Sequence, residues 1–201
     1  MNKISISGKI NKDYKPSHIV CGERFLKTTI SCRRKSGVYD DLPVVFSEVF
    51  FKDINRTVDN MIWLNAEIRT INKDGHLETF IFVLEVLPYN GEDINEVEME
   101  GYLCMTPFLR KTLRGRFITD AIIAINKRYG KSFYVPTITW GRTAIKMSRY
   151  SVGTKIEGHG RFQSRVYHKS FDNGDTEERV AYEVSLNTIN KVTGKEESYE
   201  N

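Results

Sequence analysis

The sequence is made of short runs in which apolar and polar residues alternate, and no long run has the period of an amphipathic helix. Alternation with a period of two residues is typical of strands that bury one face. The runs predict strands near residues 3–10, 25–33, 42–48, 61–71, 78–87, 97–105, 117–126, 134–140, 155–167 and 179–190. We therefore expect an all-β fold.

The second half of the chain repeats the first at a nearly constant spacing, which indicates two copies of one structural unit. Four pairs anchor the comparison, at offsets of 93, 92, 94 and 94 residues: Gly8 and Gly101, Phe25 and Phe117, Phe46 and Trp140, and Ile62 and Ile156. Each copy has a short helical segment between its third and fourth strands, which in the second copy is residues 142–150. Five strands with a short helix in this place is the order of an OB-fold barrel, so we expect two tandem five-stranded OB-folds.

The boundary between the copies follows Leu87, where Pro88, Asn90 and Gly91 interrupt the strand pattern and acidic residues follow. The predicted organisation is an OB-fold domain over residues 1–88, an acidic linker over 89–96, a second OB-fold domain over 97–190 and a short acidic tail over 191–201.

Charge is divided unevenly between the two copies. Residues 1–100 carry 13 Lys and Arg against 16 Asp and Glu, whereas residues 101–201 carry 17 against 10. Within residues 101–169, 14 basic residues accompany only two acidic ones, Asp120 and Glu157. Such a concentration in a folded segment indicates a polyanionic partner and argues against a neutral sugar.

The sequence patterns of common enzyme sites do not occur. A Gly-Lys-Ser sequence at 130–132 resembles the end of a phosphate-binding loop, but position 125, where that motif requires glycine, is Ile125. Neither G-x-S-x-G nor H-E-x-x-H is present. Cys21, Cys32 and Cys104 form no C-x-x-C pair, and the four histidines are dispersed. We expect no catalytic residues, no metal and no cofactor.

Aromatic residues are interleaved with basic residues throughout the second copy. Single-stranded nucleic acid is bound by this combination, because cations contact the phosphates and exposed rings stack on unpaired bases. Phe162 alternates with polar neighbours and is expected in the core, which leaves Arg161, Gln163 and Arg165 facing outward. No helix is basic over several turns, as a reader of duplex DNA would require.

Three segments of the second copy carry a family pattern in order and at the correct spacing: "IIAINKRYGKSFYVPTITWG", "VGTKIEGHGRFQSRVY" and "AYEVSLNTI". With them, residues 97–190 resemble the bacterial single-stranded-DNA-binding (SSB) proteins. The resemblance implies that bases stack on four rings, which are Tyr129, Tyr134, Trp140 and Tyr167. The phosphate contacts inferred from charge and proximity are Arg110, Lys127, Arg128, Arg161 and Arg165.

The first copy matches this family more faintly. Lys35 and approximately Asp40 take the places of Tyr129 and Tyr134, so we expect this barrel to bind a strand poorly and to serve as an architectural or dimer surface. Family assemblies present four OB-folds, which implies a homodimer for a chain with two. The end of the chain, "KVTGKEESYEN", lacks an acidic Phe-terminated tip and resembles the tail-less, two-domain members of Gram-positive bacteria and their mobile elements.

The main hypothesis is a non-enzymatic protein that coats single-stranded DNA in replication, recombination and repair, with replication or recombination proteins as further partners. The alternative is a primosome-type OB-fold adaptor that acts mainly through protein partners, and a third is an enzyme accessory or oligosaccharide binder. No apolar run approaches the length of a membrane span, and the scattered cysteines favour a reducing compartment. We therefore expect a cytoplasmic, nucleoid-associated protein without membrane contact.

Overall fold

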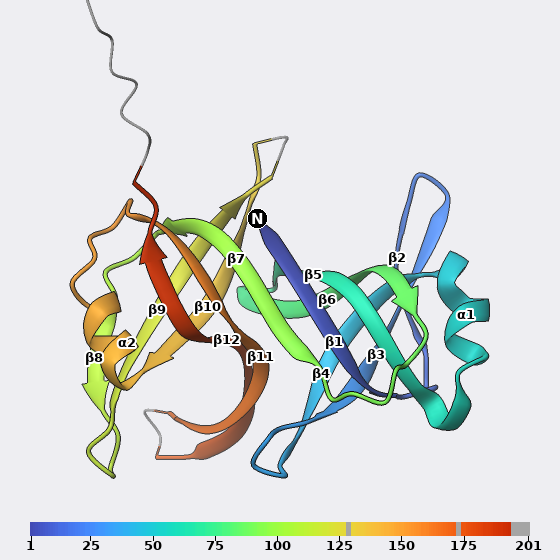
Figure 1. The fold of residues 1–201 in the computed structure, drawn as a ribbon, viewed down its shortest axis with the longest axis horizontal. Helices are drawn as coiled ribbons and strands as arrows, with labels where there is room; N and C mark the ends of the chain where they lie inside the picture. The colour runs from blue at the N-terminus through green and yellow to red at the C-terminus, as the bar shows by residue number, and fades with distance from the viewer. Residues whose placement is uncertain (128–129, 172–173, 194–201) are drawn as a thin grey trace, which may run out of the picture.

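A computed structural model describes residues 1–127, 130–171 and 174–193. These residues form two barrels that share one twelve-stranded sheet, with each chain half folded into its own barrel (Figure 1). The strands of the first barrel are β1 (Asn2–Ile10), β2 (Lys15–Val20), β3 (Glu23–Arg33), β4 (Tyr39–Ser47), β5 (Met61–Lys73) and β6 (His76–Leu87). Between β4 and β5 lie the helix α1 (Phe51–Asn55) and two short 3-10 helices, η1 (Glu48–Phe50) and η2 (Val58–Asn60).

The second barrel has the same order of elements. Its strands and helix are β7 (Asn95–Leu103), β8 (Phe108–Lys111), β9 (Phe117–Asn126), β10 (Ser132–Trp140), α2 (Gly141–Met147), β11 (Lys155–Ser170) and β12 (Thr176–Lys191). Parallel pairing of β4 with β6 and of β10 with β12 closes the barrels. This confirms the predicted all-β fold of two tandem OB barrels, each with a short helix between its third and fourth strands.

Two strands of the structure were not expected from the sequence. β2 and β8 are short strands that pair with β3 and β9 in hairpins. Every residue of β2 is exposed, and β8 is exposed except for the half-buried Arg110. Because neither strand buries a face, neither carries the alternation by which the other strands could be predicted. The helix α2 also ends earlier than the predicted segment, at Met147.

The strand registers show that the repeat runs at a constant offset of 93 residues from β1, β3 and β4 of the first barrel to β7, β9 and β10 of the second. Lys9 pairs with Ser31 in the first barrel, and Tyr102 pairs with Ala124 in the second. Gly8 and Gly101 occupy equivalent places for a steric reason, because a Cβ there would lie 2.4 Å from the Ser31 carbonyl oxygen and 2.5 Å from that of Ala124.

The same registers correct three expected equivalences by one residue. Phe25 corresponds to Ile118 rather than Phe117, Trp140 to Ser47 rather than Phe46, and Tyr134 to Asp41 rather than Asp40. In this alignment Pro43 and Pro136 coincide. The next strands, β5 and β11, are equivalent at an offset of 94, as predicted. Ile62 on β5 lies opposite Gly8, and Ile156 on β11 lies opposite Gly101.

The barrels are joined through antiparallel pairing of β1 with β7, which lie side by side in the centre of the molecule (Figure 1). Ile4 pairs with Val97, and these two residues are equivalent at the offset of 93. A pseudo-twofold axis therefore passes through this pair and relates the barrels. One continuous cluster of buried apolar residues extends from Ile4 and Leu64 in the first barrel to Val97 and Phe162 in the second.

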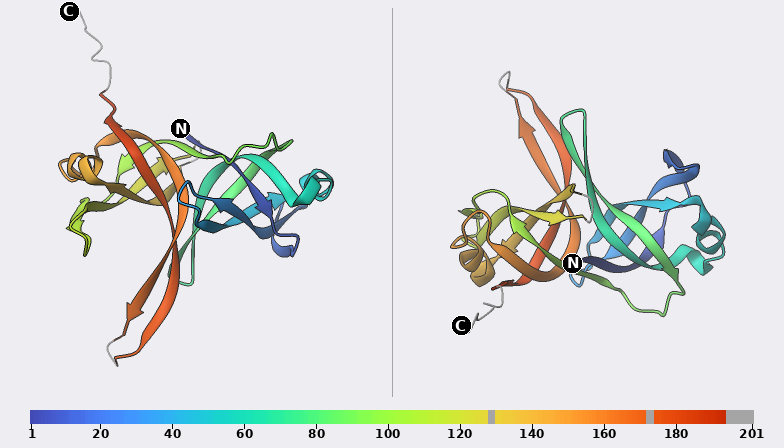
Figure 2. Two further views of the ribbon diagram at one scale, coloured as in Figure 1. Left: turned by 60° about the horizontal axis from the view of Figure 1, so that its bottom comes forward. Right: turned by 90° about the horizontal axis from the view of Figure 1, so that it is seen from above.

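The barrels differ in the length of the final hairpin. β5 and β6 are paired as far as Lys73 and His76, whereas β11 and β12 continue to Ser170 and Thr176. The longer hairpin projects from its barrel as a two-stranded ribbon (Figure 2). It extends beyond the predicted ends at 167 and 179, because its outer residues are exposed and their alternation carries no hydrophobic signal.

Candidate nucleic-acid interface

A groove of about 1200 Å³ crosses the face of the molecule and is lined by both barrels. Its lining includes equivalent strand positions of the two halves, such as Thr28 on β3 and Ala121 on β9. Residues of both final hairpins, among them Leu77 on β6 and Tyr167 on β11, also line it. The groove thus combines the same surface of each OB-fold in one continuous depression.

The structure gathers only part of the predicted site in this groove. Lys127, Arg165 and Tyr167 line it. Arg110, Tyr134, Trp140 and Arg161 do not belong to the lining. Arg128 and Tyr129 lie outside the described residues.

The three described rings of the predicted stacking platform lie at separate places. Tyr134, at the start of β10, is 49% exposed, and its backbone N–H donates to Thr70 Oγ1 on β5 of the first barrel. Trp140 is half-buried at the other end of β10, with the Arg116 guanidinium 5.5 Å from its ring centroid. Tyr167 is 36% exposed. Since alternate residues of a strand share a face, Tyr134 and Trp140 mark two ends of one face of β10.

Two of the predicted phosphate contacts are engaged by carboxylates. Arg110 donates from Nε and Nη2 to the two oxygens of Asp120, at 2.6 and 3.1 Å. Arg165 holds Glu183 in the same bidentate manner, at 3.1 Å for both bonds. The hydrogen bond to Glu183 raises the pKa of Arg165, although burial opposes it. A phosphate at either arginine would add to, or replace, an existing pair.

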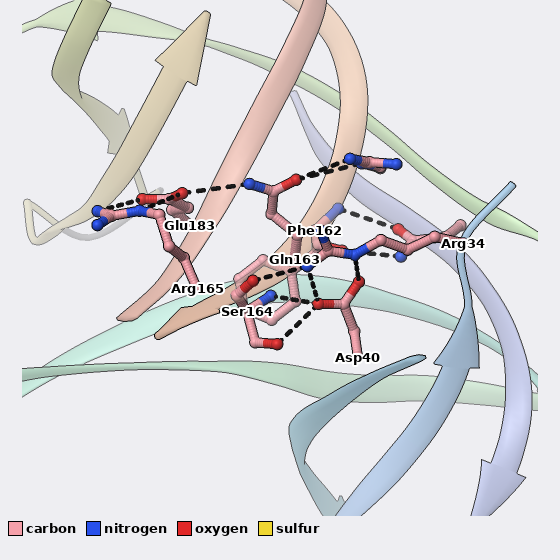
Figure 3. Close-up of polar contacts among 9 residues, drawn as sticks. Arg34, Asp40, Phe162, Gln163, Ser164, Arg165 and Glu183 are labelled. Atoms are coloured by element: carbon pink, nitrogen blue, oxygen red, sulfur yellow. Dashed lines mark hydrogen bonds and ion pairs between the residues drawn. The ribbon is translucent and has the colours of Figure 1, made fainter. Parts of the chain in front are cut away.

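Of the three residues expected to face outward, Arg161 and Arg165 are half-buried and Gln163 is buried. Phe162 is fully buried, as predicted, but Gln163 on the other face is only 4% exposed. Its Nε2 donates to Glu183 Oε1 at 3.2 Å, and its Oε1 accepts from Arg161 Nη2 at 3.1 Å (Figure 3). Burial, with nearby Arg34 adding to the effect, lowers the pKa of Arg161. The first barrel contacts this strand at Ser164, through Arg34 and Asp40.

In the groove lining, the predicted Lys127 belongs to a row of cations and rings that crosses between the barrels and whose other members the sequence did not predict. Lys127 Nζ lies 3.6 Å from the Phe133 ring centroid, and the Arg69 guanidinium lies 5.8 Å from the same ring. Arg69 also lies 3.4 Å from the ring centroid of Phe82 in its own barrel. Burial and then the charge of Arg69 lower the pKa of Lys127. Cations over ring faces are stabilised by the ring quadrupole, so this row is built from favourable contacts.

The row continues into the first barrel. The ring centroids of Phe82 and Phe25 are 5.5 Å apart, and the His18 ring stacks parallel on Phe25 with a centroid distance of 4.7 Å. The acidic net charge of the first half concealed these cations, because five of its 16 acidic residues lie between positions 92 and 100, after the last strand of the first barrel. A signal was present in β5 and β6, where Arg69, Phe80 and Phe82 alternate with buried residues.

An exposed ring on β8 was also missed. Phe108 is 61% exposed and lies opposite Asp120, the partner of Arg110. It therefore adds a ring to the surface that extends from β8 over β9.

No helix of the described chain combines the length and the apolar character needed to cross a membrane. In the same residues, no three His, Cys, Asp or Glu side chains gather in a manner that could hold a metal ion.

The fold and the groove place the chain among proteins built from tandem OB barrels. No protein-family model matches the sequence, and no curated protein sequence matches it. The structure is similar to that of the wild-type single-stranded DNA binding protein from Thermus aquaticus, with a TM-score of 0.72 and 18% identity over 96% of this chain and 94% of that chain. A deletion mutant of that protein aligns with a TM-score of 0.71 and 16% identity, over 100% of this chain and 98% of that chain. At these identities the likeness concerns the fold, and it extends over both barrels.

Proposed function

We propose that this chain is a non-catalytic protein that binds single-stranded DNA in the groove between its barrels and coats it during replication, recombination or repair. The observation that carries the proposal is the groove lined by both barrels, in which the cations Arg69 and Lys127 accompany the exposed ring of Tyr167. Cations for phosphates beside rings for bases are what an unpaired strand requires. The fold shared with the Thermus aquaticus single-stranded DNA binding protein supports the same function.

The strand would use residues of both barrels. In the second barrel we propose Tyr134, Trp140 and Tyr167, together with Tyr129, as stacking rings. The proposed phosphate contacts of that barrel are Arg110, Lys127, Arg128, Arg161 and Arg165. To these we add Arg69 from the first barrel, because its guanidinium lies in the groove lining between two rings.

Titration of tryptophan fluorescence with oligo(dT) at two salt concentrations tests the proposed function. We expect saturable quenching that weakens as salt rises, because phosphate contacts release counterions. The chain has two tryptophans, and Trp63 is held in the first barrel by a 2.7 Å bond from its Nε1 to Ser5 Oγ. A Trp140→Phe variant keeps a ring at that site, so its quenching should fall while oligonucleotide anisotropy still reports binding. No saturable binding at low salt would refute the proposal.

Substitution of Arg69 tests whether the first barrel contributes to DNA binding. Arg69→Ala should weaken oligo(dT) binding by about fivefold or more, in the range of one lost stacking or phosphate contact. Arg69 forms an ion pair with Glu67 at 3.0 Å. Arg24→Ala is the matched control, because Arg24 also lies in the first barrel and pairs with a glutamate, Glu48, at 2.9 Å, yet is not part of the groove lining. Equal effects of the two substitutions would assign the loss to net charge alone.

We also propose that two chains assemble into a homodimer with four OB-folds, as the family resemblance implies. Sedimentation equilibrium should then give about twice the 23.3 kDa of one chain. The adaptor alternative would be favoured if long oligonucleotides were not covered stoichiometrically and a replication protein bound instead.

A further inference from the structure

The edge of β11 loses its neighbouring strand in the middle of the barrel. In the described part of the chain, β7 pairs with β11 only as far as Gly160, opposite Val97. Beyond that point, alternate residues of β11 present their backbone groups to an open edge. At Phe162 the side chain of Asn95 replaces the missing strand, since its Nδ2 donates to the Phe162 carbonyl at 2.8 Å and its Oδ1 accepts from the Phe162 N–H at 3.0 Å.

The next edge position, Ser164, is satisfied by the other barrel. Its N–H and its hydroxyl both donate to Asp40 Oδ1, each at 2.7 Å, and its carbonyl accepts from Arg34 Nη2 at 2.7 Å. Arg34 also donates to both oxygens of Asp40. Asp40 is 1% exposed, and the Arg34 side chain is 22% exposed (Figure 3). Arg34 and Asp40 thus make the hydrogen bonds to the Ser164 carbonyl and N–H that a neighbouring strand would otherwise make at the base of the ribbon.

The pseudo-twofold counterpart of this junction has different chemistry. The first barrel repeats the asparagine, because Asn2 holds the Ile68 carbonyl and N–H at 2.7 and 3.2 Å. The position equivalent to Asp40 is Phe133, however, which contacts Lys127 and Arg69 through its ring. Asp40 therefore stands where the second barrel has the aromatic residue Phe133. Its carboxylate bonds to β11 and is not directed to the groove.

We propose that Asp40 is a positioning residue of the nucleic-acid site, which fixes the base of the β11–β12 ribbon so that Arg165 and Tyr167 face the groove. This inference rests on the proposed function. Arg165 directly follows Ser164 and Tyr167 lies three residues along the strand, where the ribbon has only its own two strands. Isolated two-stranded ribbons are marginally stable, so the anchor at Ser164 determines how well these side chains are held.

Electrostatics alone predicts the opposite result from this proposal. Removing a negative charge near a bound polyanion should strengthen binding. Under the proposal, Asp40→Asn instead weakens oligo(dT) binding by about fivefold or more, within the cost of losing one stacked base. Asp41→Asn is the matched control, because Asp41 is the exposed neighbour and undergoes the same charge change. Its affinity should equal or exceed that of the wild type. Equal affinities for the two variants would overturn the proposal.

A double-mutant cycle and hydrogen exchange identify the route of the effect. If Asp40 acts through the ribbon, Asp40→Asn should cost little in a Tyr167→Ala background, because the two changes remove the same contact. Amides of residues 164–170 should exchange faster in Asp40→Asn than in Asp41→Asn without any DNA present. Unchanged exchange overturns the positioning role even if the wild type binds no DNA, which would be a separate failure of the proposed function. If Asp40→Asn does not fold, Ser164→Ala removes one hydroxyl donor, keeps the Arg34–Asp40 pair and should shift exchange in the same direction.

Discussion

At the scale of single residues, two carboxylates are buried among the described residues, Asp40 and Glu183, and each is paired with an arginine. An unpaired buried charge would be costly to the fold. Burial by itself raises the pKa of Asp40, but the hydrogen bonds from Arg34 and Ser164 outweigh it and hold the pKa below its ordinary value.

The lowered pKa of Asp40 predicts an acid-dependent loss of stability. A group with a depressed folded-state pKa stabilises the protein fully above its unfolded value, about 3.9 for Asp, and loses that contribution as the pH falls through the folded value. Urea unfolding at several pH values should show wild type more stable than Asp40→Asn near pH 7. The gap should narrow at pH values below about 4. A gap of constant size down to the lowest pH at which the protein folds would contradict this assignment.

The three cysteines are predicted to differ in reactivity. Cys32 is 2% exposed, and its burial, with Asp40 and Asp41 adding to the effect, raises the pKa of its thiol well above the usual range. Cys104 is exposed, but partial burial raises its pKa and its Sγ donates to the Ile122 carbonyl at 3.3 Å. Since the thiolate is the reactive form, a thiol reagent followed by mass mapping should label exposed Cys21 first, Cys104 more slowly and Cys32 only on unfolding. Rapid labelling of native Cys32 would contradict the burial described.

At the scale of elements, the β11–β12 hairpin changes register between His159 and Gly160. A Cβ on Gly160 would lie 2.1 Å from the Ser185 carbonyl oxygen and 2.7 Å from Leu186 Cα, so the two strands approach too closely for a side chain. The first barrel has the same irregularity between Asn65 and Ala66. The position is therefore a repeated feature of both hairpins.

Gly160→Ala is expected to destabilise the protein by about 1–3 kcal/mol, because backbone atoms of β12 must move to admit the methyl group. The measurement is the free energy of unfolding in urea. His159→Ala, at the exposed neighbouring position, is the control and should change stability little. Equal stabilities of the two variants would show that the strands can separate at this point without cost.

Strands that bury one face could be predicted from the sequence to within a few residues, whereas exposed β2, exposed β8 and the outer ribbon could not. The same limit applies to the site. Lys127 and Tyr167, which line the groove, could be predicted as candidates because their surroundings in the sequence are basic and aromatic. The contact of Asp40 with Ser164 could not be predicted, because the two residues are 124 positions apart along the chain. Arg69 was missed because the second ring beside it comes from the other barrel.

At the scale of the whole molecule, the barrels share a sheet and a continuous core, with β1 paired to β7 across the pseudo-twofold axis. Separating the barrels would expose buried residues such as Ile4 and Val97 on both sides. Exposure of apolar surface is the main cost of such a separation.

Calorimetry should therefore show one cooperative unfolding transition for the full chain, in which the calorimetric and van't Hoff enthalpies agree. Two resolved transitions would mean that each barrel is stable without the other. Repeating the scan at several protein concentrations separates this coupling from any contribution of the proposed homodimer, because only the latter depends on concentration.

The equivalence of Asp40 and Phe133 across the pseudo-twofold axis has a consequence for how such a molecule can change. In a homodimer of single barrels, one codon sets both junctions, so a carboxylate at one would place a carboxylate at the other. Two barrels in one chain are free of this constraint. The junction at Asp40 can then hold the ribbon, while the junction at Phe133 retains its aromatic ring and the adjacent cations. Each position can mutate without altering its counterpart.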